Sequence, residues 1–143
     1  MPYEYLEDIA VSDVAFRAWG KTPEIMFAAA ADALMNTMVE DLDSISYKLT
    51  RGIQVEETGI DMLLFEFLQE IIYFKDAESL LLRVPEVEIR EQSGTYALYT
   101  EARGEQVDAE KHELLVDVKA VTFHRYSVEE NEKGWEAVVI LDT

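Results

Sequence analysis

The sequence predicts an α+β fold, a single compact domain in which a mostly antiparallel sheet packs with two main helices. Apolar residues recur at helical spacing in two stretches, residues 22–38 and 60–74. Strand-like segments follow at residues 86–90, 96–103, 118–128 and 135–141. Because these strands are grouped after the helices and do not alternate with them, antiparallel pairing is expected.

The first helix has a clear predicted beginning, preceded by a short strand-like alternation in residues 16–20. Thr22 can cap the helix, Pro23 suits its first position, and Glu24 lies near the positive end of its dipole. One face then carries a set of apolar residues, Phe27, Ala30, Ala31, Leu34 and Met38. We interpret this face as core, in preference to a cofactor-binding surface.

The second helix is more apolar than a helix with a single buried stripe. Its main stripe consists of Leu64, Phe67, Leu68, Ile71 and Ile72. Met62 and Phe65 widen this stripe, which predicts burial on more than one side, either between the first helix and a sheet or partly against a partner. Further along, Ser93-Gly94 predicts a tight turn between two strands.

Nothing divides the chain into parts, so we expect one domain over residues 1–143. The sequence has no Pro- or Gly-rich linker, and its lack of cysteine excludes disulfides, thiolate metal sites and cysteine nucleophiles. The acidic N-terminus is unlike a signal peptide, and the longest apolar segment, residues 62–74, is too short to cross a bilayer. We therefore expect a cytoplasmic protein without a membrane segment.

Charge is the strongest compositional signal. The chain has 12 Lys and Arg against 30 Asp and Glu, a formal net charge of −18. Tight direct binding of nucleic acid is not expected, because such binding depends on cations that neutralise phosphates. The charge favours metal ions and basic protein surfaces as partners, although it would also serve solubility in a hot or salt-rich habitat.

Candidate chemistry is confined to carboxylates. The sequence has no phosphate-binding glycine loop, nucleophile elbow or Cys/His zinc pattern, and we interpret its two histidines, His112 and His124, as structural or hydrogen-bonding residues. At the chain end, Asp142 adjoins the terminal carboxylate of Thr143. Hard cations prefer such ligands, but an acidic chain end is also commonly just solvated.

Several segments together resemble the archease family over essentially the whole chain. The N-terminal part is similar to the family's Tyr-x-Glu-His-Thr-Ala-Asp element and its strand ending Arg-Ala-Tyr-Gly: here Tyr5-Leu6-Glu7-Asp8 and Ser12-Asp13-Val14-Ala15-Phe16-Arg17-Ala18-Trp19-Gly20. The later matches are Ala102-Arg103-Gly104-Glu105, His112-Glu113, Val118-Lys119-Ala120-Val121-Thr122-Phe123-His124 and Val139-Ile140-Leu141-Asp142-Thr143.

The chain departs from the family pattern at three places. Asp8-Ile9-Ala10-Val11-Ser12 replaces the usual His-Thr-Ala and is two residues longer, so no role of that histidine carries over. Trp19 and Phe123 replace tyrosines, which keeps the aromatic packing but removes a hydroxyl group at each position.

The resemblance implies a non-enzymatic activator of the guanylylated tRNA-splicing RNA ligase, which promotes ligase guanylylation and multiple turnover in tRNA splicing. It also implies a site for a divalent metal ion (Ca²⁺, Mg²⁺ or Mn²⁺) formed by Asp13 and Asp142, to which the carboxylate of Thr143 would add. Lys119 and His124 are candidates for contact with the ligase. A local ion pair is the alternative role for Lys119.

Two other functions are compatible with the sequence. The acidic surface and the wide apolar helix would also suit a chaperone-like protein-binding module. A stand-alone metal-dependent hydrolase is a third hypothesis, although no pair of carboxylates stands out among 30 acids as a catalytic dyad.

Overall fold

The computed structural model describes residues 2–7 and 13–143, which form two α-helices and eight β-strands. The order is β1 (Tyr3–Leu6), β2 (Val14–Gly20), α1 (Pro23–Met38), β3 (Leu49–Glu57), α2 (Ile60–Glu78), β4 (Leu80–Arg83), β5 (Glu88–Gln92), β6 (Thr95–Gln106), β7 (Ala120–Asn131) and β8 (Gly134–Asp142), with a 3-10 turn at Leu42–Ser44. The predicted α+β fold is confirmed.

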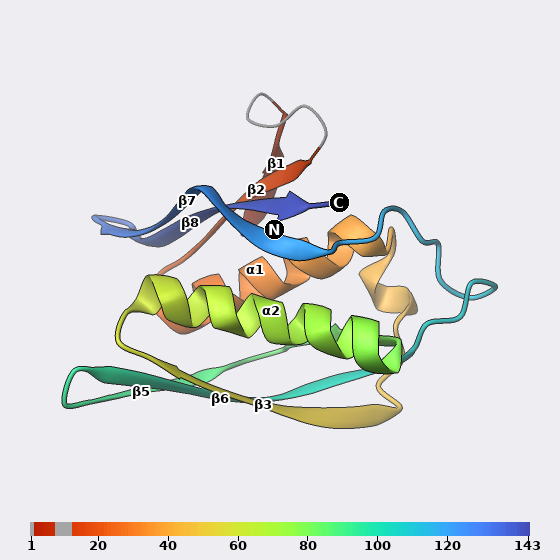
Figure 1. Ribbon diagram of the computed structural model, residues 1–143, viewed down its shortest axis with the longest axis horizontal. Helices are drawn as coiled ribbons and strands as arrows, with labels where there is room; N and C mark the ends of the chain where they lie inside the picture. Colours follow the sequence, from red (N-terminus) through yellow and green to blue (C-terminus); the bar gives the residue numbers. More distant parts are fainter. Residues whose placement is uncertain (1, 8–12) are drawn as a thin grey trace.

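The strands form two sheets with the helices between them (Figure 1). One sheet has the order β1-β2-β8-β7, and the other has the order β3-β6-β4 with β5 also paired to β6. Every pairing is antiparallel, as expected. The two helices therefore form the middle layer of a sheet–helix–sheet arrangement, which explains why both are so apolar.

Helix α1 begins as the sequence predicts. The Thr22 hydroxyl accepts a hydrogen bond from the Ile25 N–H at 3.2 Å, and proline occupies the start of the first turn. Four of its five alanines, at positions 29, 30, 31 and 33, are buried, and their small side chains let the neighbouring layers approach the helix closely.

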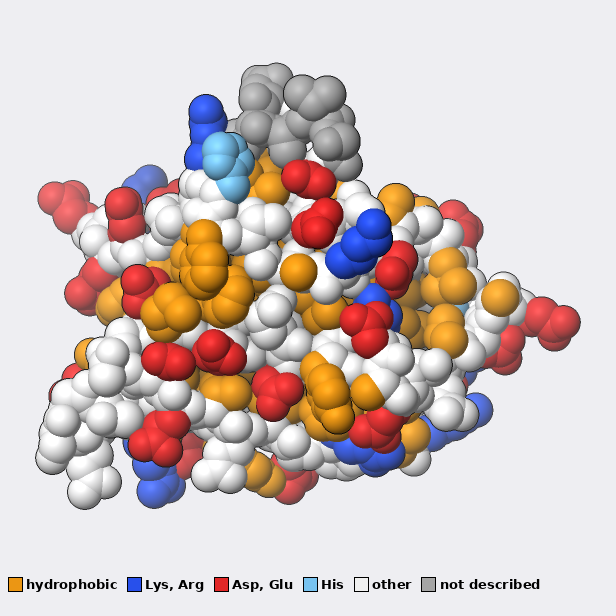
Figure 2. All heavy atoms as spheres, in the orientation of Figure 1, with side chains coloured by type: hydrophobic (Ala, Val, Ile, Leu, Met, Phe, Trp, Pro, Cys, Tyr) orange, Lys and Arg blue, Asp and Glu red, His pale blue; other side chains and the backbone are white. Residues whose placement is uncertain are grey.

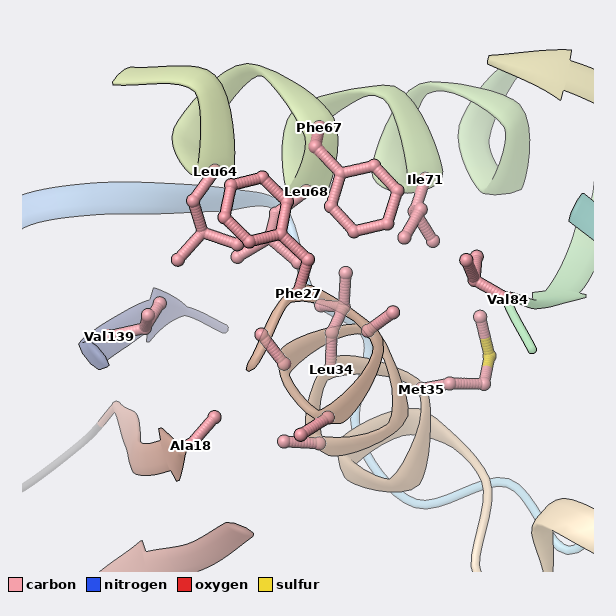
Figure 3. Close-up of a cluster of buried hydrophobic side chains, with 14 of the residues drawn as sticks. Ala18, Phe27, Leu34, Met35, Leu64, Phe67, Leu68, Ile71, Val84 and Val139 are labelled. Carbon is pink, nitrogen blue, oxygen red and sulfur yellow. The ribbon is translucent and has the colours of Figure 1, made fainter. Parts of the chain in front are cut away.

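Helix α2 packs against α1 at the centre of the core. The rings of Phe67 and Phe27 stack with their centroids 5.7 Å apart, and Figure 3 shows Leu64, Leu68 and Ile71 beside them. These α2 side chains are fully buried. Burial of the second helix between the first helix and a sheet is thus confirmed.

The β5–β6 hairpin has the predicted turn. Ser93 and Gly94 both adopt positive φ, at 54° and 80°, the conformation that two-residue hairpin turns require. Among the described residues, neither helix combines the length and the apolar character needed to cross a membrane.

Candidate metal centre and its flanking contacts

The two predicted metal-binding aspartates lie at the same end of neighbouring strands. Val14 of β2 pairs with Leu141 of β8, so Asp13 immediately precedes this pair and Asp142 immediately follows it. Asp13 is half-buried and Asp142 is exposed. Residues directly opposite each other on antiparallel strands have their Cβ atoms about 5 Å apart, so a continuation of this register by one residue would place the two aspartates opposite each other.

The donor chemistry at this strand end suits a hard divalent cation. Asp13 and Asp142 supply carboxylate oxygens, and the terminal carboxylate of Thr143 follows directly. Across residues 2–7 and 13–143, however, His, Asp and Glu side chains form no group of three or more that could hold a metal. The described side chains alone therefore provide a partial ligand set. The altered segment 8–12 lies outside the described residues.

Lys119 lies on the other side of Asp142. Its backbone N–H donates to the Asp142 carbonyl at 2.8 Å, and its side chain is exposed, one residue before β7 begins. No ion pair of Lys119 is found among the described residues, so the structure does not support the local ion pair that was the alternative role.

His124 lies in an irregular part of β7. The pairing of β7 with β8 is interrupted between Thr122 and Ser127, and Arg125 within this bulge has a φ of 53°. A bulge redirects the side chains that it contains. His124 is exposed there, about 10 Å along the strands from the end that carries Asp142.

Aromatic contacts hold the β7 bulge against the beginning of α2. The ring of Phe123 stacks on Phe65 with centroids 4.3 Å apart, and the Tyr126 hydroxyl donates to the Asp61 carbonyl at 2.6 Å. Burial raises the pKa of Tyr126, so its hydroxyl remains a donor at neutral pH. The bulge is thus anchored on both sides of His124.

His112 has a different role, as a buried partner of Glu105. Its Nδ1 accepts from the Asp108 N–H at 2.9 Å, so the ring proton lies on Nε2, which donates to Glu105 Oε2 at 3.0 Å. The same oxygen accepts from Lys111 Nζ at 2.6 Å and from the Ser46 N–H at 2.7 Å. These contacts hold the loop after β6 against the segment before β3.

Glu105 is therefore a buried carboxylate with a full set of donors. Its side chain is 5% exposed, and Lys48 Nζ lies 3.4 Å from its second oxygen. The hydrogen bond from Lys111, the Ser46 N–H and the His112 ring lower the pKa of Glu105 to about 2. This cluster was not predicted as a unit, because strand alternation places residue 105 outward; the loop after β6 covers it.

The chain matches the model of the archease protein family (MTH1598/TM1083) over residues 3–143. It is 36% identical to the archease of Pyrococcus furiosus, covering 98% of this chain and 97% of that one. The archease of Methanosarcina barkeri is 33% identical, with 98% and 94% covered.

Two solved structures share the fold. Protein 1598 of Methanobacterium thermoautotrophicum superposes with a TM-score of 0.85 at 29% identity, covering 99% of both chains. A Thermotoga maritima protein described as an archease and possible chaperone gives a TM-score of 0.61 at 15% identity, covering 94% of this chain and 93% of that one, and shows likeness of fold alone. From the family match over nearly its whole length and its identity to several archeases, this chain belongs to the archease family.

Proposed function

We propose that this archease activates the guanylylated tRNA-splicing RNA ligase, promoting ligase guanylylation and multiple turnover without itself forming a covalent intermediate. The observation that carries the proposal is the convergence of Asp13, Asp142 and the chain end at one strand end, with Lys119 beside them. This group is partly exposed, so it could enter a site on another protein.

In this proposal Asp13, Asp142 and the Thr143 carboxylate hold a divalent cation, Ca²⁺, Mg²⁺ or Mn²⁺. When bound, the ion would supply positive charge for positioning phosphate oxygens at the ligase active site. Because the described side chains provide only a partial ligand set, water or the ligase would complete the coordination. Such sharing is compatible with the delivery or exchange of a metal between two proteins.

Electrostatics favour a basic docking surface on the ligase. The formal charge of −18 produces a negative field that speeds encounter with a cationic partner. Lys119 then provides a local contact of opposite sign to the surrounding surface, and the His124 ring provides a hydrogen-bonding group on β7. Both side chains are exposed, as such contacts require.

The decisive experiment measures multiple-turnover ligation of tRNA halves by a catalytic amount of ligase, with and without this protein. We expect acceleration that Asp13→Ala and Asp142→Ala each reduce strongly. The double variant should lose little more than either single variant, because ligands of one ion act as a unit. Asp43→Ala is the matched control, since that carboxylate is 97% exposed on the 3-10 turn.

Calorimetric titration with Ca²⁺, Mg²⁺ and Mn²⁺ tests the metal site separately from activation. If both single variants bind metal and activate the ligase like the wild type, the site assignment is wrong. If the wild type leaves the ligase unchanged at all concentrations, the activator role itself is wrong.

An exposed apolar groove favours a second candidate, a chaperone-like protein-binding module. Val107, Leu114, Leu115 and Val116 are 41–47% exposed and line a groove of about 320 Å³ with Met38. Figure 2 shows hydrophobic side chains on the side where Figure 1 places the loop between β6 and β7. Exposed apolar surface of this kind binds other proteins.

An aggregation assay distinguishes the chaperone-like function from activation of the ligase. A chaperone-like protein would suppress aggregation of unrelated unfolded proteins, and Leu115→Ser with Val116→Ser should abolish that effect. An activator specific for the ligase would have no such effect. If suppression occurs and is unchanged in this double variant, the groove is not responsible.

A further inference from the structure

We propose a second binding site, for a small anionic ligand with an aromatic body such as a mononucleotide, in the cleft between α1, β2 and the β7–β8 turn. The cleft has a volume of about 880 Å³, large enough for such a ligand. It lies at the opposite end of β2 from Asp13. The proposal is independent of ligase activation and of the candidate metal centre.

The cleft lining is enriched in cations relative to the rest of this acidic protein. Its lining holds three cations, Arg17, Lys21 and Lys133, against two carboxylates, Glu132 and Glu136. The whole chain has 12 basic against 30 acidic residues. A cleft that gathers a quarter of the basic side chains favours a ligand that is itself an anion.

Two of these cations are available to a ligand. Arg17 is already held by Glu4 at 3.1 Å and by Glu136 at 2.7 Å. Lys21 and Lys133 are exposed and form no ion pair with any carboxylate that the structure describes. In such an acidic protein, unpaired lysines beside one cleft are well placed to bind phosphate oxygens.

The rest of the lining suits an aromatic group. Both tryptophans of the chain, Trp19 and Trp135, line the cleft, together with Ile25, which is 48% exposed. The Arg17 guanidinium lies 4.4 Å from the centroid of the Trp19 ring and fixes that ring. Stacking on indole rings is sequence-tolerant and contributes to the binding of nucleobases.

Close backbone approach joins the two chain segments that carry the lysines of the cleft. Gly134 has a φ of 134°, and a Cβ atom there would lie 2.3 Å from the Gly20 carbonyl oxygen. The turn before β8 is therefore held directly against the end of β2. This contact fixes the backbone of Lys133 relative to that of Lys21, so only the lysine side chains have to be ordered on binding.

The net negative charge of the protein opposes the binding of RNA more than the binding of a small anion. At physiological salt the Debye length is about 8 Å, so a ligand inside the cleft responds mainly to the side chains around it. A long RNA would also lie over carboxylates outside the cleft. The same chain can thus bind a nucleotide and reject RNA.

Intrinsic fluorescence tests the proposal directly, because both tryptophans line the cleft. Titration with ATP should quench the emission in a saturable way, with a Kd below about 1 mM that calorimetry confirms. The double variant Lys21→Ala/Lys133→Ala should weaken ATP binding roughly tenfold, as expected for the loss of two partly exposed charge contacts. Adenosine and inorganic triphosphate, each alone, should bind more weakly than ATP.

Arg90→Ala/Arg103→Ala is the matched control, since it removes two exposed positive charges from the other sheet and should leave ATP binding unchanged. Three results would each overturn the proposal. These are the lack of saturable ATP binding, an unchanged Kd in the lysine double variant, and triphosphate that binds as tightly as ATP, since the last would exclude a role for the aromatic surface.

Discussion

Glu105 shows how one residue can be both charged and structural. A carboxylate that is 5% exposed keeps its charge because Lys111, Lys48, the His112 ring and the Ser46 N–H surround it. Each donor comes from a segment that has no regular secondary structure. The residue therefore joins the loop after β6 to the segment before β3.

We expect Glu105→Gln to lower the free energy of unfolding at pH 7 by on the order of 1–3 kcal/mol. The folded-state pKa is lowered to about 2 from 4.5, so the stabilisation is fully present above about pH 5 and is lost as the pH falls toward 2. Urea unfolding of wild type and variant should thus differ at pH 7 and converge near pH 2. Glu110→Gln, at an exposed carboxylate of the same loop, is the control.

In contrast to Glu105, Lys119 is expected to contribute little to stability. Because its side chain is exposed and has no ion pair among the described residues, Lys119→Ala should change the free energy of unfolding by less than about 0.5 kcal/mol. Ligase activation should fall nonetheless, since the Lys119 backbone is hydrogen-bonded to Asp142 and the exposed side chain starts next to the candidate metal centre. Lys111→Ala provides the contrast, because that lysine neutralises Glu105 and its loss should lower stability. Equal losses of stability and activation in Lys119→Ala would indicate a structural role.

At the scale of elements, helix α2 is the component on which both sheets depend. Its buried face includes Phe67, which stacks on Phe27 of α1 in the middle layer (Figure 3). Phe67→Ala should lower the free energy of unfolding by about 3–5 kcal/mol through the cavity it leaves. Tyr73→Ala on the same helix is the control; its side chain is 56% exposed, so we expect a loss below about 1 kcal/mol by chemical unfolding.

Two strands, β3 and β4, were missed in the sequence for different physical reasons. Strand β3 alternates in burial, but only Ile53 is fully buried and the polar residues Arg51 and Glu57 occupy half-buried positions, so the alternation in its sequence is weak. Strand β4 follows α2 directly with Leu80-Leu81-Leu82, all buried, and a continuous apolar run has no readable period. When β3 and β4 are not recognised, the remaining strands predict a single sheet, whereas the structure has two.

The candidate site was predictable only in part, for a reason of topology. The chain end suggested Asp142 and Thr143 as carboxylate ligands, but pairing with Asp13 depends on the β2–β8 register, which no local pattern encodes. The resemblance to archeases supplied that pairing. The cleft beside Trp19 and Lys133 was missed because its walls come from opposite ends of the chain.

At the scale of the whole molecule, charge and shape divide the surface into distinct regions. Figure 2 shows carboxylates scattered over one face among exposed apolar groups. The candidate metal centre and the cationic cleft lie at opposite ends of β2, about 20 Å apart along a seven-residue strand. One end is thus suited to cations and the other to anions, so ligands of opposite charge need not compete.

The same distribution predicts that the isolated protein binds RNA weakly or not at all at physiological salt. RNA affinity depends on many cations that contact successive phosphates, and a chain with 12 basic against 30 acidic residues repels a polyanion. Two lysines in one cleft can hold a single nucleotide but not a strand. A gel-shift titration with tRNA halves should show no saturable complex at protein concentrations that saturate ligase activation. Tight binding whose affinity falls steeply with salt would contradict this prediction and would indicate a direct role in holding RNA.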